Sequence, residues 1–180
     1  MTLRFQQSAA FLTLLALCVT SAGAGDWPQF RGPNGDGIST EGPIPAEWDA
    51  AKNVKWKADL PGQGSSSPIV LGDRVFVTCY SGYGEAPGGD DTKLARHLVC
   101  VDRPSGEILW TQGVKNSASE DRYQGFITEH GYASGTPVTD GERFYAFFGK
   151  SGVYAYDLDG KEQWNVSVGT SSSNRRWGSA

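Results

Sequence analysis

The sequence predicts an all-β protein built from repeated four-stranded antiparallel sheets. Three observations lead to this prediction: a composition rich in glycine and aromatic residues, short runs of alternating apolar residues, and two copies of one extended pattern. The 180 residues include 24 Gly, six Trp, seven Tyr and eight Phe. Such a balance is typical of β-structure with many tight turns. The length is sufficient for one domain with a hydrophobic core.

The charge balance argues against a nucleic-acid partner. The formal net charge is −4, the pI is about 5.1, and no basic run is longer than the pair Arg175 and Arg176. Proteins that bind nucleic acid need a basic patch to neutralise phosphates. We therefore expect no nucleic-acid binding.

Residues 1–24 have the pattern of a cleaved signal peptide. Arg4 supplies a positive charge, Ala9–Val19 is an apolar stretch, and Ala22–Ala24 fits an A-x-A cleavage site. The apolar stretch is too short to cross a bilayer, so we expect no integral membrane span after cleavage. Bulky Leu17 disfavours Cys18 as a lipid-anchoring cysteine. The expected location is periplasmic or extracellular, with association to the outer membrane left open.

Residues 25–53 are predicted to be an N-terminal packing segment. It begins with "DWPQFRGPNGDGIS" (26–39), in which Trp27 and Phe30 stand among prolines and glycines. We expect these aromatic rings to pack against the repeats, with "GPNGDG" forming a turn. An EF-type calcium loop does not fit the stretch, because its acidic first and last ligand positions would fall on Gly32 and Pro43.

The repeated pattern is clearest in its first half. Ser66–Gly82 and Ser134–Gly152 both contain a small residue, a proline, a β-branched residue, a G-D/E-R turn and then alternating apolar residues. The two stretches match at an offset of 69 residues, which pairs Gly72 with Gly141.

The second half of the pattern occurs in Leu98–Trp110 and Val153–Trp164. Each contains an alternating apolar run, an aspartate (Asp102 or Asp157), a glycine-containing turn and a terminal tryptophan. The offset here is 54 to 55 residues, because the insertion Gly82–Arg96 replaces a tight "GKSG" turn in the second copy.

Each unit thus predicts four short antiparallel strands, the last of which ends in tryptophan. Four strands in about 40 residues are typical of one blade of a β-propeller. A partial copy precedes the two units, with a strand ending at Trp56, and another partial copy follows Trp164. Residues 54–180 are therefore predicted to form about two full blades plus part-blades.

The recurring residues have predicted structural roles. A propeller blade cannot bury both faces alone, so a large aromatic residue between neighbouring sheets can bury about 200 Å². We expect this blade-docking role for Trp56, Trp110 and Trp164. Asp102 and Asp157 are expected to accept hydrogen bonds from amides of their own turns.

These motifs resemble a known family. "VCVDRPSGEILW" and "YAYDLDGKEQW" resemble the repeat of PQQ-like, or quinoprotein alcohol dehydrogenase-like, β-propellers. Together with the opening segment and "RRWGSA", they resemble its secreted bacterial branch. The family includes PQQ-dependent dehydrogenases and cofactor-free members such as the lipoprotein of the outer-membrane assembly machinery. The resemblance implies an eight-bladed ring, of which this chain would be an N-terminal fragment.

The family's quinone chemistry is not evident in these residues. The resemblance implies that a dehydrogenase would carry adjacent cysteines, calcium ligands and a catalytic aspartate, and the chain has no adjacent cysteines. We therefore expect no catalytic residue, no cofactor and no metal ligand. The alternative is a PQQ- and calcium-dependent dehydrogenase that oxidises alcohols or sugars and whose acidic ligands lie outside this chain.

Glu129 and His130 form the most site-like pair of residues. They lie in the glycine-rich stretch "TEHGYASGTP", and loops at the mouth of a propeller commonly carry function. The alternative is that His130 only hydrogen-bonds the backbone. The sequence contains no G-x-S-x-G, H-x-x-x-H or C-x-x-C motif.

A disulfide between Cys79 and Cys100 is left open. Pairing Phe148 with Val153 across the "GKSG" turn, and transferring that register to the first unit, places Cys100 opposite Val77. Cys79 is then a diagonal neighbour on the same face, which is a poor geometry for a disulfide.

The favoured function is that of an exported, non-catalytic scaffold or assembly factor of the bacterial envelope. We expect the two long insertions, Gly82–Arg96 and Lys115–Ala133, to form the surface that binds a protein or another envelope macromolecule.

Overall fold

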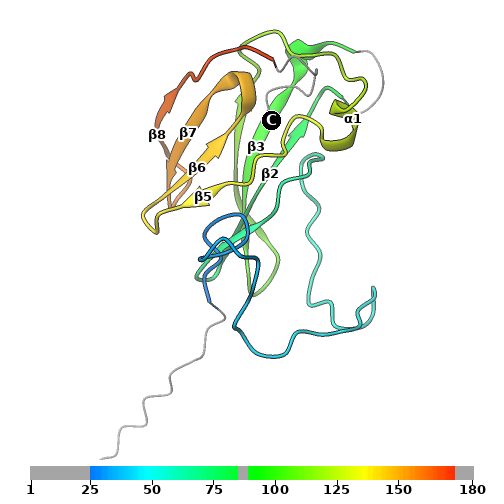
Figure 1. Ribbon diagram of the computed structural model, residues 1–180, viewed down its shortest axis with the longest axis vertical. Helices are drawn as coiled ribbons and strands as arrows, with labels where there is room; N and C mark the ends of the chain where they lie inside the picture. Colours follow the sequence, from blue (N-terminus) through cyan, green and yellow to red (C-terminus); the bar gives the residue numbers. More distant parts are fainter. Residues whose placement is uncertain (1–24, 85–88, 173–180) are drawn as a thin grey trace, which may run out of the picture.

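The computed structural model describes residues 25–84 and 89–172, and it consists mainly of two four-stranded antiparallel sheets (Figure 1). The predicted signal peptide, residues 1–24, and the "RRWGSA" stretch lie outside the described residues. Blade 1 has the strand order β1-β2-β3-β4 and blade 2 the order β5-β6-β7-β8. The strands are β1 (Ile69–Leu71), β2 (Arg74–Ser81), β3 (Ala95–Asp102), β4 (Ile108–Lys115), β5 (Val138–Thr139), β6 (Arg143–Phe147), β7 (Val153–Asp157) and β8 (Glu162–Val166). The all-β fold with four strands in each unit, predicted from the repeat, is confirmed.

Three short helices interrupt the loops. They are η1 (Asp91–Lys93), α1 (Ile127–His130) and η2 (Gly149–Ser151). The first two lie in the insertions that follow β2 and β4, and η2 lies in the β6–β7 connection.

The core lies between the two blades. Alternation along β2 and β6 directs Phe76 and Phe144 to the facing surfaces, where their rings stack with centroids 3.7 Å apart. Further buried side chains from both sheets complete this cluster: Ile69, Leu98, Cys100, Val114, Ala146, Phe148 and Tyr156. Neither sheet can bury this face alone, so each blade needs its neighbour.

Two tryptophans dock on glycines of the next repeat unit. A Cβ placed on Gly106 would lie 2.5 Å from the Trp56 ring, and one on Gly160 would lie 2.8 Å from the Trp110 ring. Both glycines have positive φ, 82° and 83°, which glycine adopts without strain. Each glycine thus allows the backbone conformation of the turn and leaves room for the ring of the preceding tryptophan.

The two tryptophans differ in their polar contacts. Trp56 Nε1 donates to the carbonyl oxygen of Arg103 at 2.8 Å. The equivalent carbonyl in blade 2, that of Leu158, instead accepts a hydrogen bond from Arg74. Trp110 Nε1 is buried without a partner among the described residues.

The predicted position of the tryptophans within strands was wrong. Trp110 and Trp164 lie inside β4 and β8, and both strands continue beyond them, while Trp56 lies in an extended segment outside any strand. Trp164 packs against Tyr145 with ring centroids 5.8 Å apart and stays 44% exposed. Among the described residues, the later glycine Gly169 has no atom within 4 Å of its Cβ position and so does not pack on this ring.

The repeat aspartates organise their turns. Asp102 Oδ1 accepts from Ser105 N at 2.8 Å and from Ser105 Oγ at 2.7 Å, and these bonds lower the pKa of Asp102. Asp157 Oδ1 accepts from the amides of Asp159 and Lys161. Both carboxylates are acceptors for turn amides, and each turn ends at a docking glycine.

The opening segment reaches both blades through its backbone. Trp27 N donates to Val70 O at 2.8 Å, Val70 N donates to Trp27 O at 2.9 Å, and Thr139 N donates to Pro28 O at 2.9 Å. These bonds cover the free edge of β1. The expectation that Phe30 packs against the repeats was wrong: its side chain is 58% exposed, and the guanidinium of neighbouring Arg31 lies over its ring.

Cys79 and Cys100 are both free and buried. The assumed strand register was wrong by one residue, because Phe147, not Phe148, pairs with Val153. The same register holds in blade 1, where Cys100 pairs with Phe76 and Cys79 pairs with His97 in the β2–β3 ladder. The two cysteines are three residues apart along the ladder and therefore lie on opposite faces of the sheet, which precludes a disulfide.

We predict that replacing Gly160 with alanine costs more stability than replacing Gly141. Both glycines have positive φ, so each Gly→Ala change costs about 1–2 kcal/mol of backbone strain. At Gly141 no atom lies within 4 Å of the added Cβ, whereas at Gly160 the Trp110 ring must move. We expect a further loss of about 1–3 kcal/mol for Gly160→Ala in urea unfolding. Equal losses at the two positions would contradict the docking contact.

The two thiols are predicted to be unreactive in the folded protein and to make it less stable at alkaline pH. Burial raises the pKa of both Cys79 and Cys100 from 9.0 to about 11. The folded state therefore holds these protons more tightly, and the free energy of unfolding should fall as the pH rises from about 9 through 11. A thiol reagent at pH 8 should label neither cysteine before urea is added. Rapid labelling of the native protein would contradict the burial.

Candidate functional site

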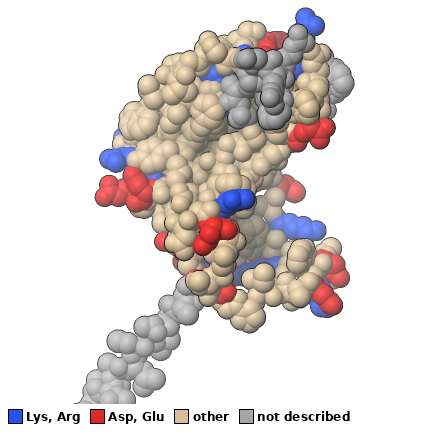
Figure 2. All heavy atoms as spheres, in the orientation of Figure 1, with Lys and Arg blue, Asp and Glu red and all other residues tan. Residues whose placement is uncertain are grey.

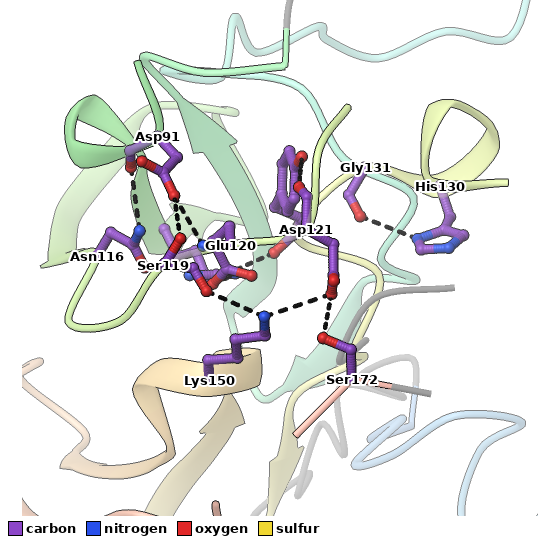
Figure 3. Close-up of polar contacts among 11 residues, drawn as sticks. Asp91, Asn116, Ser119, Glu120, Asp121, His130, Gly131, Lys150 and Ser172 are labelled. Carbon is purple, nitrogen blue, oxygen red and sulfur yellow. Dashed lines mark hydrogen bonds and ion pairs between the residues drawn. The ribbon is translucent and has the colours of Figure 1, made fainter. Parts of the chain in front are cut away.

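The two insertions dock on one another at one end of blade 1. Asp91 Oδ2, in the first insertion, accepts from Glu120 N at 2.8 Å and from Ser119 Oγ at 3.2 Å, both in the second (Figure 3). Asn116 Nδ2 donates to Asp91 O at 3.0 Å. We call this pair of insertions, residues 82–84 with 89–96 and residues 115–133, the insertion lobe. Residues 85–88 of the first insertion lie outside the described residues.

A cluster of tyrosines forms the interior of the insertion lobe. Tyr132 lies at its centre, with ring centroids 5.4 Å from Tyr80, 5.4 Å from Tyr83 and 6.2 Å from Tyr123. Burial raises the pKa of the Tyr132 hydroxyl, which donates to Asp121 O at 2.7 Å. Gly84 allows this packing, because a Cβ there would lie 2.8 Å from the Tyr132 ring.

A buried ion pair holds the lobe to blade 1. Arg96, on β3, meets Glu120 with Nη2 and Oε1 2.6 Å apart, and both side chains are 1% exposed. Arg96 Nε also donates to Tyr132 O at 2.8 Å, and the guanidinium lies over the Tyr132 ring. A buried charge is tolerated only when it is paired and hydrogen-bonded. Moving the second insertion away would leave the buried Arg96 without Glu120, so the pair fixes the position of this insertion.

Lys150 joins the lobe to blade 2. Its Nζ donates to Ser119 O at 3.0 Å and lies 3.4 Å from Asp121 Oδ2 (Figure 3). Asp121 Oδ2 also accepts from Ser172 Oγ at 2.5 Å. The burial of Lys150 was not predicted, because a lysine in the tight turn "GKSG" gives no signal of burial.

A cavity of about 720 Å³ opens on the insertion lobe. Its walls carry aromatic, acidic, basic and amide side chains: Tyr83, Asp90, Asp91, Ser119, Glu120, Arg122, Tyr123 and Gln124, with Gly89. This volume lies within the range of small-molecule sites, about 300–1,000 Å³. None of the lining side chains was predicted as a site residue, because the cavity exists only when the two insertions meet.

Glu129 and His130 lie in α1, and the His130 side chain lies apart from the contacts around Lys150 (Figure 3). His130 Nδ1 donates to Gly131 O at 2.9 Å. This contact agrees with the alternative that His130 only hydrogen-bonds the backbone. Glu129 is exposed, and no hydrogen bond or ion pair joins the two side chains within the described part of the chain. Their functional role stays a prediction.

Ser81 and His97 form a side-chain pair that the sequence did not indicate. Ser81 Oγ lies 2.9 Å from His97 Nε2 across β2 and β3, and burial lowers the pKa of His97. His97 faces Cys79 on the blade 1 surface opposite blade 2. The pair satisfies two half-buried polar groups inside the sheet.

Residues 25–84 and 89–172 contain no group of three or more His, Cys, Asp or Glu side chains placed to hold a metal ion. None of their helices is long and apolar enough to cross a membrane.

Comparison with known proteins identifies the repeat. Residues 92–179 match the family model described as outer membrane protein assembly factor BamB. No curated protein matches the chain. The matched stretch contains β3 and β4 of blade 1 and all four strands of blade 2. Residues 92–179 therefore carry PQQ-like β-propeller repeat sequence.

We predict that Glu120→Gln destabilises the protein by about 3 kcal/mol, because it leaves the buried Arg96 charge without its counter-ion. The matched control is Glu47→Gln, which removes the exposed ion pair with Lys52 and should change stability by about 0.5 kcal/mol or less. Urea unfolding gives both values. Similar small losses for the two variants would contradict the buried pair.

Proposed function

We propose that this PQQ-like repeat protein is an exported, non-catalytic scaffold or assembly factor of the bacterial envelope. It binds a protein partner through the insertion lobe. The supporting observation is that both insertions are fixed to each other and to both blades. The buried ion pair holds the second insertion in one conformation. A binding surface that is ordered before it meets its partner gains affinity, because less conformational entropy is lost on binding.

The family match supports the choice of partner class. The matching model is named for an outer membrane protein assembly factor, and assembly factors work by binding other proteins. The pattern of residues 1–24 supports export, because it has the charge, apolar length and cleavage site of a signal peptide. The proposed location is periplasmic or extracellular, with association to the outer membrane left open.

The insertion lobe has the composition of an interaction surface. Tyr123, Arg122 and Phe126 lie on it, and tyrosine and arginine are enriched where proteins bind one another. Phe126 is 60% exposed at the start of α1. A partner that covered this ring would bury a large apolar surface.

The alternative function is a PQQ- and calcium-dependent dehydrogenase. It predicts stoichiometric quinone binding, dependence on calcium and electron transfer to an artificial acceptor. The scaffold predicts none of these, and its binding should survive calcium removal. Titration of the folded protein with quinone and calcium separates the two functions, because saturable one-to-one quinone binding would overturn the scaffold.

We predict that a photo-crosslinking residue at Gln124, on the lobe, captures one discrete envelope protein in living cells. The same residue at Lys161, in the exposed β7–β8 turn of blade 2, should capture none. Crosslinking at Gln124 should persist with a calcium chelator present. The partner should then bind the purified chain, and Arg122→Glu should weaken that binding at least tenfold. Equal crosslinking at both positions, or none at Gln124, would contradict the proposal.

A further inference from the structure

We propose that the cavity in the insertion lobe is a binding site for an uncharged saccharide. This inference goes beyond the scaffold function and does not depend on it. It is carried by the cavity, by the tyrosine rings in its wall, and by oriented polar groups that still have free hydrogen-bonding capacity.

The cavity has an aromatic wall that is held in place. Tyr83 is 8% exposed and Tyr123 is partly buried, and both pack against Tyr132. A tyrosine ring presents a flat apolar face beside a polar hydroxyl. The C–H face of a sugar ring is likewise apolar and its rim is polar, so the two surfaces are complementary.

Two carboxylates in the wall are each fixed through one oxygen. Asp90 Oδ1 accepts from Thr92 N at 3.0 Å, and Asp91 Oδ2 accepts from Glu120 N at 2.8 Å. No described residue donates to the second oxygen of either carboxylate. Each of the two is therefore oriented by the protein and retains acceptor capacity for a ligand. The third carboxylate, that of Glu120, is 1% exposed and is paired with Arg96.

Donors complement these acceptors. Arg122 and Gln124 line the cavity, and neither side chain makes a hydrogen bond with the described residues. Because Glu120 is paired with Arg96, the remaining charged groups of the wall are Asp90, Asp91 and Arg122, with a formal charge of −1. A site with so small a net charge gains little from a strongly charged ligand. It suits hydroxyl groups, which both donate and accept.

The size of the cavity agrees with this ligand class. About 720 Å³ exceeds what one water or ion needs and falls within the range of small-molecule sites. The wall contains no aliphatic side chain, which argues against a lipid or another wholly apolar ligand. A lysine side chain is the main rival, since carboxylates beside tyrosine rings also attract cations.

The first test screens the full chain on a glycan microarray and then titrates the best-bound oligosaccharide by calorimetry. A trilysine peptide is titrated in parallel. We expect saturable one-to-one binding of a neutral oligosaccharide and no saturable binding of trilysine. If no glycan on the array binds, or if trilysine alone binds, the proposal is overturned.

Variants then locate the site. Arg122→Gln changes an exposed side chain of the cavity and should weaken oligosaccharide binding at least tenfold while leaving the urea midpoint unchanged. Tyr123→Ala should also weaken binding. Lys161→Gln, a matched charge removal on blade 2, should bind like the unchanged protein. Binding unaffected by Arg122→Gln and Tyr123→Ala would place the ligand elsewhere and overturn the proposal.

The outcome is independent of the protein-binding proposal. Glycan binding by the purified chain without any photo-crosslinking at Gln124 would leave the saccharide site standing and overturn only the scaffold. Crosslinking without any glycan binding would leave the scaffold standing and remove only the saccharide site.

Discussion

A four-stranded antiparallel sheet that is apolar on both faces must be covered on both sides, and this requirement organises the whole structure. In blade 1, Phe76 and Cys100 face blade 2, while Cys79 and Val99 face the opposite side, where Trp56 packs. The tryptophan contact with a turn glycine gives each covering element a fixed position. The contact between Trp56 and Gly106 recurs between Trp110 and Gly160, so the same tryptophan–glycine contact sets the spacing between successive units.

The insertion lobe depends on this spacing. Arg96 belongs to a blade 1 strand and Lys150 to a blade 2 turn, and the second insertion is bonded to both. The lobe therefore keeps its shape only while the blades keep their relative position. This dependence gives a propeller scaffold an ordered binding surface without a separate domain, and the polar cavity is formed where the two insertions meet.

Sequence patterns predicted those parts of the fold that are set locally. Alternation predicted the strands, and the spacing of Asp102 and Asp157 from their glycines predicted the turns. The register was wrong by one residue because η2 adds a helical turn between β6 and β7, which no residue of "GKSG" indicates. The site was not predictable in the same way: Arg96 and Glu120 are 24 positions apart, and a charged pair in two polar loops resembles ordinary surface residues. Glu129 and His130 were predicted from their residue types and their glycine-rich stretch, and neither feature indicates which side chains meet in space.

The contact between Trp110 and Gly160 is the interaction that the account depends on most, and NMR observes it directly. The Hα of Gly160 that takes the place of a side chain points at the indole ring, so the ring current should shift it far upfield. Replacing Trp110 with phenylalanine should remove most of that shift. We predict the same upfield shift for Gly106 beneath Trp56. Random-coil Hα shifts at both glycines, in a protein that is otherwise folded, would contradict the docking of one unit on the next.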